Sequence, residues 1–185
     1  MSIKQELVQT YRWLRQYGLN DSHSGNASVR DGDTIWVTPT GCCADTLTDQ
    51  DLVACQLDGS VGAGASLDAP LHLATYLASP DTRCLLHSHG PYTVAITMNG
   101  HDFMPPDFEG MYYFSRVPVL TIPYQDYVEE SPGQVSRTLA NYPVAVVRGH
   151  GVYAHAKTIN LAYKWTSSLE LSAKTAMLAR QAGTL

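Results

Sequence analysis

The sequence has few charged side chains and no long apolar run. Of its 185 residues, 16% are charged, the formal net charge is −5, and the lysines and arginines form no cluster. Such a surface does not suit nucleic acid, so we expect no nucleic-acid partner. No apolar stretch is long enough to span a bilayer, and we therefore expect no membrane partner.

Cysteine is also scarce. The chain has four cysteines, Cys42, Cys43, Cys55 and Cys84, with neither the paired spacing of a zinc motif nor a dense disulfide pattern. We interpret them as free thiols in a reducing compartment. Residues 1–6 lead into a mixed polar and apolar helix and carry no secretory signal, so a cytoplasmic location is expected.

The spacing of apolar residues predicts one α/β domain over residues 1–185. We expect strands near residues 27–30, 34–38, 52–57, 83–87, 117–122, 144–148 and 151–155, and helices near 3–17, 69–78, 91–98, 131–140 and 158–182. Residues 100–118 and 124–131 are interpreted as loops, with Ser131 capping the next helix. This order of elements predicts a largely antiparallel sheet covered by helices.

Residues suited to metal binding gather in one helix–strand segment, which contains Asp68, His72, His87 and His89. His87 and His89 are two residues apart at a predicted strand end. Their imidazoles would point to the same side, at a spacing suited to one divalent cation. Two polar residues on a solvated strand face would give the same pattern.

A third candidate ligand, His150, lies far downstream between Gly149 and Gly151. It follows a second apolar strand. Flanking glycines allow a sharp bend and a close backbone approach, which can aim a histidine into a cleft. The alternative is a glycine-rich hairpin with a histidine at its tip, but together with the upstream pair we favour a metal ligand.

Four segments then carry a family resemblance. Residues 24–30 (SGNASVR), 38–41 (TPTG), 86–90 (LHSHG) and 148–152 (RGHGV) occur in the order and spacing of the class II aldolase/adducin family. The chain resembles this family, which includes sugar-phosphate aldolases and a pentulose-phosphate epimerase, over nearly its whole length. The resemblance implies a three-layer α/β/α fold with a largely antiparallel central sheet. It also implies a homotetramer with active sites at subunit interfaces.

The resemblance implies roles for the histidine-rich segments. His87, His89 and His150 would bind Zn²⁺, although imidazole ligands also suit Mn²⁺, Fe²⁺ or Co²⁺. Asp68 stands where the resembling aldolases usually have a glutamate as the acid/base residue and the resembling epimerase has an aspartate. It could act as base, serve as a fourth ligand, or cap the following helix. His72 could orient that carboxylate or be a structural histidine.

Substrate-binding positions also follow from the resemblance. The family holds the substrate phosphate at positions that correspond here to Gly25, Asn26, Thr40, Gly41 and Ser66. Glycine backbones and short polar side chains can converge on an anion. Ordinary turn chemistry explains the same residue types equally well.

Two departures from the family pattern bear on the substrate. The family commonly has paired serines before the acidic residue, whereas this chain has Leu67, which donates no hydrogen bond. The leucine therefore suggests, as an alternative to a phosphorylated substrate, one that carries a carboxylate or no phosphate. The sequence stops at Leu185, where the resembling enzymes continue with a segment that closes over the site, so we expect a more open site or a different substrate class.

The second acid is expected between residues 100 and 118. Related aldolases supply a tyrosine from about this region to a neighbouring subunit's site, and the corresponding candidates here are Tyr113 and Tyr112. Asp107 and Glu109 are further candidates. Packing of aromatic side chains is the alternative interpretation.

These features predict a metal-dependent lyase of the class II aldolase type. It would cleave a carbon–carbon bond of a small ketose or ketose phosphate through a metal-stabilised enediolate. A pentulose-phosphate 4-epimerase and a metal-dependent decarboxylase would use the same intermediate. A non-catalytic, adducin-like interaction module is the alternative outside enzyme chemistry.

Overall fold

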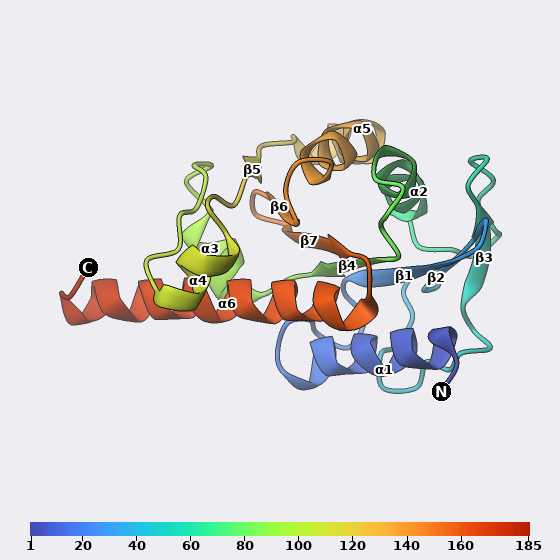
Figure 1. The fold of residues 1–185 in the computed structure, drawn as a ribbon, viewed down its shortest axis with the longest axis horizontal. Helices are drawn as coiled ribbons and strands as arrows, with labels where there is room; N and C mark the ends of the chain where they lie inside the picture. Colours follow the sequence, from blue (N-terminus) through green and yellow to red (C-terminus); the bar gives the residue numbers. More distant parts are fainter.

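A seven-stranded sheet forms the centre of the molecule. The computed structural model describes residues 1–185, and the strand order is β3-β2-β1-β4-β7-β6-β5 (Figure 1). The strands are β1 (Asn26–Asp31), β2 (Thr34–Val37), β3 (Val53–Gln56), β4 (Cys84–Ser88), β5 (Val119–Leu120), β6 (Val144–Val147) and β7 (Gly151–Ala156). Neighbouring strands pair antiparallel except β5 and β6, which run parallel. The sheet is therefore mixed and mostly antiparallel, as expected.

Helices cover both faces of the sheet. They are α1 (Ile3–Gln16), α2 (Ala69–Ala78), α3 (Pro91–Ile96), α4 (Phe108–Tyr113), α5 (Tyr127–Leu139) and α6 (Ile159–Ala182), with one 3-10 turn, η1 (Tyr124–Asp126). α2 and α5 pack together on one face, while α1 and α6 lie on the other (Figure 1). The C-terminal half of α6 projects beyond the sheet, with α3 and α4 beside it. No helix combines the length and apolar character needed to cross a membrane.

The central strands of the sheet position side chains of the candidate site. β4 is buried along its whole length and pairs with β1 on one side and β7 on the other. Asn26 of β1 and Tyr153 of β7 both lie opposite His87 of β4. Residues directly opposite each other in a sheet present their side chains to the same face. The register therefore forms one row, Asn26–His87–Tyr153, from three separate segments.

Three regions differ from the expectation drawn from sequence. The strand expected near residues 117–122 is shorter, because only Val119–Leu120 pairs with β6. Part of the expected 100–118 loop forms α4, because the Asp107 side chain accepts a hydrogen bond from the Gly110 N–H at 3.0 Å and caps the helix. α5 begins at Tyr127, so Ser131 lies inside the helix and does not cap it. Because proline is typical of a first helical turn, the presence of Pro132 led to a predicted helix start about one turn too late.

Candidate active site

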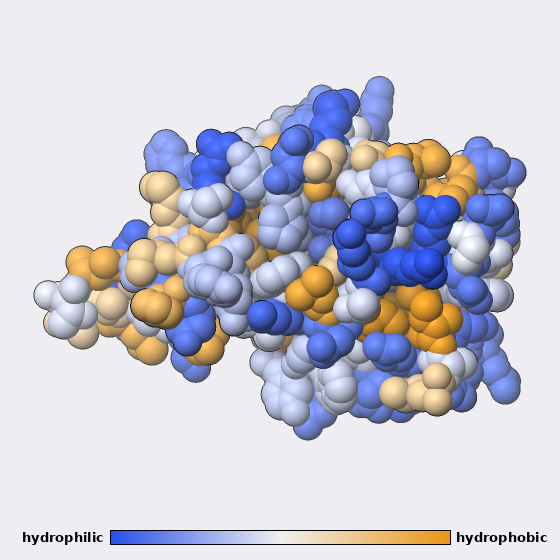
Figure 2. Space-filling model, viewed as in Figure 1, coloured by the Kyte–Doolittle hydropathy of each residue, from blue (hydrophilic) through white to orange (hydrophobic).

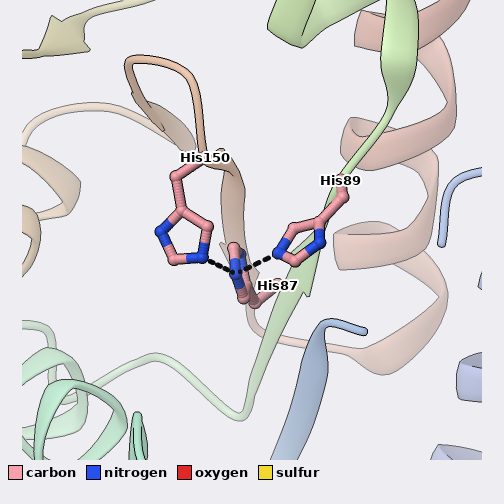
Figure 3. A group of neighbouring side chains, drawn as sticks. All are labelled: His87, His89 and His150. Atoms are coloured by element: carbon pink, nitrogen blue, oxygen red, sulfur yellow. Dashed lines mark hydrogen bonds between the residues drawn. The ribbon is translucent and has the colours of Figure 1, made fainter. Parts of the chain in front are cut away.

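Three histidine side chains meet beside the end of β4. His87 belongs to β4, His89 follows it, and His150 lies in the turn between β6 and β7 (Figure 3). The Nε2 atom of His87 lies 2.9 Å from Nε2 of His89 and 3.3 Å from Nε2 of His150. One ligand atom from each histidine lies within 4.8 Å of the others. The structure thus brings together the three candidate ligands from two distant segments.

This arrangement fits a divalent cation. Tetrahedral zinc with Zn–N bonds of about 2.0–2.1 Å separates its nitrogen ligands by about 3.3 Å. The distances from His87 Nε2 to the other two Nε2 atoms, 2.9 and 3.3 Å, are close to this value. His87 donates its Nδ1–H to the carbonyl oxygen of Val152 at 3.0 Å, which leaves its Nε2 lone pair available. Burial lowers the pKa of all three imidazoles, to about 4 for His89, and so favours the neutral form that binds metal.

The two glycines beside His150 have different tasks. Gly149 has a φ of +70°, a conformation that glycine adopts without a steric penalty, and it makes the sharp bend before the histidine. At Gly151 the constraint is space. A Cβ there would lie 2.3 Å from the Ser88 carbonyl oxygen and 2.7 Å from Cδ2 of His89. Only glycine allows β7 to approach the His87–His89 segment this closely.

Asp68 lies next to the histidines, with its Oδ2 3.9 Å from Nε2 of His87. Asp68 is the N-cap residue of α2, but its side chain makes no capping hydrogen bond. The carboxylate instead accepts hydrogen bonds from Asn26 at 2.9 Å, Tyr127 at 2.8 Å and Tyr153 at 3.0 Å. Burial would raise the pKa of this carboxyl group, but the adjacent His87 and the hydrogen bonds from Asn26 and Tyr127 lower it to about 2. Asp68 is therefore ionised at neutral pH.

A line of buried hydrogen bonds leads from Asp68 into the protein. Asn26 donates to Asp68 and accepts at Oδ1 from His72 Nε2 at 2.6 Å. Nδ1 of His72 accepts from the Ser28 hydroxyl at 2.6 Å, and Ser28 accepts from the Tyr76 hydroxyl at 2.8 Å. The Asp68 carboxylate can only accept, so the direction of each hydrogen bond in this line follows from it. Every bond is donated toward Asp68. Burial lowers the pKa of His72 to about 4, so this histidine is neutral and reaches Asp68 through Asn26.

Asp68 and the three histidines line one polar cleft of about 200 Å³. Four of the five predicted substrate-binding residues also line it, namely Gly25, Asn26, Thr40 and Ser66. The fifth, Gly41, follows Thr40 in an exposed turn and is not part of the lining. The cleft therefore joins the candidate metal ligands, a carboxylate and a wall of short polar residues.

The sequence matches the family described as "Class II Aldolase and Adducin N-terminal domain" over residues 5–177. The chain belongs to the class II aldolase/adducin family.

Relatives within this family include enzymes of more than one reaction. The L-fuculose phosphate aldolase of Methanocaldococcus jannaschii is 27% identical over 178 residues, which cover 95% of this chain and 96% of that protein. The 3-oxo-tetronate 4-phosphate decarboxylase of Haemophilus influenzae is 29% identical over 94% of this chain and 86% of its own. Among solved structures, L-fuculose-1-phosphate aldolase from Thermus thermophilus superimposes with a TM-score of 0.88, at 29% identity, over 95% of this chain and 93% of that one.

Tyr113, the acid predicted from the family pattern, lies outside the cleft of its own chain. Tyr113 is in α4, where its ring packs against Trp165 at 5.6 Å between centroids and carries Lys164 Nζ 4.1 Å above it. Neither Tyr113 nor the exposed Tyr112 lines the cleft. A role for Tyr113 in the site of a neighbouring subunit stays a prediction.

Sequence reasoning missed two other tyrosines. Tyr127 was assigned to a polar loop and Tyr153 to the interior of a strand, yet both hydroxyl groups donate to Asp68. Tyr127 lines the cleft, whereas Tyr153 is completely buried behind it. No local pattern marks either residue, because each meets Asp68 only through contacts between distant segments.

Proposed function

We propose that this member of the family is a metal-dependent lyase. It cleaves a carbon–carbon bond of a small ketose or ketose phosphate through an enediolate. The observation that carries the proposal is the convergence of three histidine Nε2 atoms beside the ionised Asp68 in a polar cleft. No lysine lines this cleft, so its residues offer no amine for a Schiff base.

His87, His89 and His150 would hold the cation, with Zn²⁺ the expected metal and Mn²⁺, Fe²⁺ or Co²⁺ as alternatives. When bound, such a cation withdraws charge from the carbonyl and hydroxyl oxygens of a ketose and stabilises the enediolate. Asp68 moves the proton at the carbon next to the carbonyl. Asn26 and the buried hydrogen bonds behind it hold the Asp68 carboxylate in place.

The proposal extends to the assembly. We propose one domain over residues 1–185, working in the cytoplasm as a homotetramer. Exposed apolar side chains support self-association, because Phe108 and Met111 of α4 and Leu178 of α6 lie on the projecting end of the molecule. Figure 2 shows hydrophobic residues gathered on this end. Apolar surface concentrated in this way marks contact sites on proteins.

A decarboxylase is the second candidate, because the family relative from Haemophilus influenzae acts as one. Loss of carbon dioxide from a 3-oxo acid would leave the same kind of enediolate, with the same demand on the histidines and on Asp68. Aspartate at position 68 also keeps the epimerase alternative open. Released aldehyde, released carbon dioxide or a retained pentulose phosphate distinguishes the three reactions.

The test begins with the metal. Elemental analysis of gently purified protein should find close to one equivalent of a divalent metal per chain, and a His87→Ala/His89→Ala variant should lose it. His101→Ala, which changes an exposed histidine outside the cleft, is the control. The metal-loaded protein is then assayed with ketose phosphates and 3-oxo acid phosphates for the three products.

The outcomes separate the candidate functions. Protein that binds none of Zn²⁺, Mn²⁺ or Fe²⁺ after incubation would contradict the lyase proposal and favour the adducin-like interaction module. Metal that remains in the double variant would contradict the assignment of the ligands. Metal binding with carbon dioxide as the product would favour the decarboxylase.

A further inference from the structure

The hydroxyl group of Tyr127 lies in the cleft beside Asp68. Its oxygen is 2.8 Å from Asp68 Oδ1, and the ring meets the His150 ring edge-on, with centroids 4.6 Å apart. The carboxylate can only accept, so the phenol is the donor. Tyr127 is half-buried and is the one tyrosine that lines the cleft. A substrate bound beside the three histidines would therefore meet a phenol already hydrogen-bonded to the carboxylate.

Tyr153 supports this pair from the buried side. Its hydroxyl oxygen lies in direct contact with that of Tyr127, and its hydroxyl hydrogen is donated to Asp68 Oδ2 at 3.0 Å. Only Tyr127 is open to the cleft, so Tyr153 is a positioning residue.

We propose that Tyr127 is a catalytic residue that relays a proton between a hydroxyl group of the substrate and Asp68. The proposal rests on the lyase function proposed above. In cleavage, the hydroxyl group on the carbon beyond the scissile bond gives its proton to the Tyr127 oxygen. At the same time the original Tyr127 proton moves to Asp68 Oδ1.

The remaining steps balance this transfer. The carbon–carbon bond breaks, an aldehyde leaves, and the electron pair of the bond passes to the ketone fragment as an enediolate. Protonated Asp68 then gives its proton to the carbon that lost the aldehyde. One proton has moved from oxygen to carbon, and nothing is oxidised or reduced overall. The acid is thus supplied by the same chain, whereas the family pattern predicts Tyr113 of a neighbouring subunit.

The test separates the two proton transfers. Metal-loaded protein is incubated in D₂O with dihydroxyacetone or dihydroxyacetone phosphate, and exchange of the carbon-bound hydrogen is followed by NMR. Carbon–carbon bond formation is measured with the same ketones and glycolaldehyde or lactaldehyde. Tyr127→Phe should reduce bond formation about 100-fold or more, the usual range for removal of a general acid, yet change exchange less than about threefold. Asp68→Asn should lose both activities.

Matched variants and metal analysis complete the design. Tyr92→Phe changes another half-buried tyrosine, outside the cleft, and should leave both rates unchanged. Metal content should be equal in wild type, Tyr127→Phe and Tyr92→Phe, which excludes loss of metal as the cause. A Tyr113→Phe variant completes the comparison.

The outcomes are distinct. If Tyr127→Phe lowers exchange and bond formation equally, the tyrosine only positions Asp68 and the proposal is overturned. It is also overturned if bond formation survives in Tyr127→Phe and is lost in Tyr113→Phe. Wild-type protein that shows neither exchange nor bond formation would contradict the lyase function itself, and the relay with it.

Discussion

The ring of Tyr153 lies stacked on the ring of His87, with centroids 4.1 Å apart and 2° between the ring planes. The same tyrosine donates its hydroxyl hydrogen to Asp68. One buried side chain therefore contacts both a candidate metal ligand and the candidate base. The stack fixes the plane of the His87 ring, and the hydroxyl group fixes one oxygen of the carboxylate.

The first prediction separates these two contacts. Tyr153→Phe keeps the stacked ring and should keep the metal, but it removes a buried donor to a charged group. We expect the free energy of unfolding to fall by about 2 kcal/mol. Tyr153→Leu also removes the stack and should weaken metal binding, measured by competition with a chelator. Equal metal affinity in the Phe and Leu variants would contradict a role for the stack.

The second prediction concerns pH and His72. Burial lowers the pKa of His72 from its usual 6.5 to about 4 in the folded protein. Between pH 7 and pH 5 the unfolded state therefore binds a proton that the folded state does not, and stability falls as the pH falls. His72 alone should lower the free energy of unfolding by about 2 kcal/mol between pH 7 and pH 5.

His72→Gln tests this effect, because glutamine offers an amide donor and acceptor but does not titrate. Urea unfolding of both metal-free proteins at pH 7 and pH 5 is the measurement. The variant should be less stable than wild type at pH 7, and the gap should narrow by about 2 kcal/mol at pH 5. A constant gap would show that His72 binds its proton equally in both states.

The third prediction compares the glycines beside His150. Gly151→Ala would force its Cβ against the Ser88 carbonyl oxygen and the His89 ring, so metal affinity should fall about tenfold or more. In Gly149→Ala, the positive φ should cost about 1–2 kcal/mol of stability. The nearest atom to its added Cβ is Met98 Sδ at 3.5 Å, so the metal should stay. Chelator competition and urea unfolding measure the two quantities, and equal metal loss in both variants would contradict the steric argument.

The fourth prediction concerns phosphate. Leu67 is an exposed residue of the cleft lining, where it offers no hydrogen bond. Leu67→Ser should add a donor and tighten binding of inorganic phosphate about tenfold, measured by isothermal titration calorimetry. Leu171→Ser, an equally exposed leucine on α6, is the control. Unchanged phosphate affinity in Leu67→Ser would mean that this wall of the cleft does not face the anion.

Much of the fold could be predicted from sequence, because the apolar spacing of a strand or helix is local. The expected segments for α2 and β4 agree with the structure to within one residue at each end. Errors arose where a single residue misled, as at Pro132 in α5, or where a short helix depends on its cap, as at Asp107 before α4. The family motifs identified His87, His89 and His150 together as candidate ligands, and the structure places one ligand atom of each within 4.8 Å of the others.

The sequence by itself determined most of the strand and helix pattern, the family and the residue types available for a metal and a base. Only the tertiary structure decided what surrounds Asp68. Its partners Asn26, Tyr127 and Tyr153 come from β1, α5 and β7, and strand register together with helix packing brings them within hydrogen-bond distance. Such contacts join residues tens of positions apart, and no periodicity in the chain encodes them. For that reason the sequence could name Asp68 as a candidate base, but only the fold could reveal the phenol in contact with it.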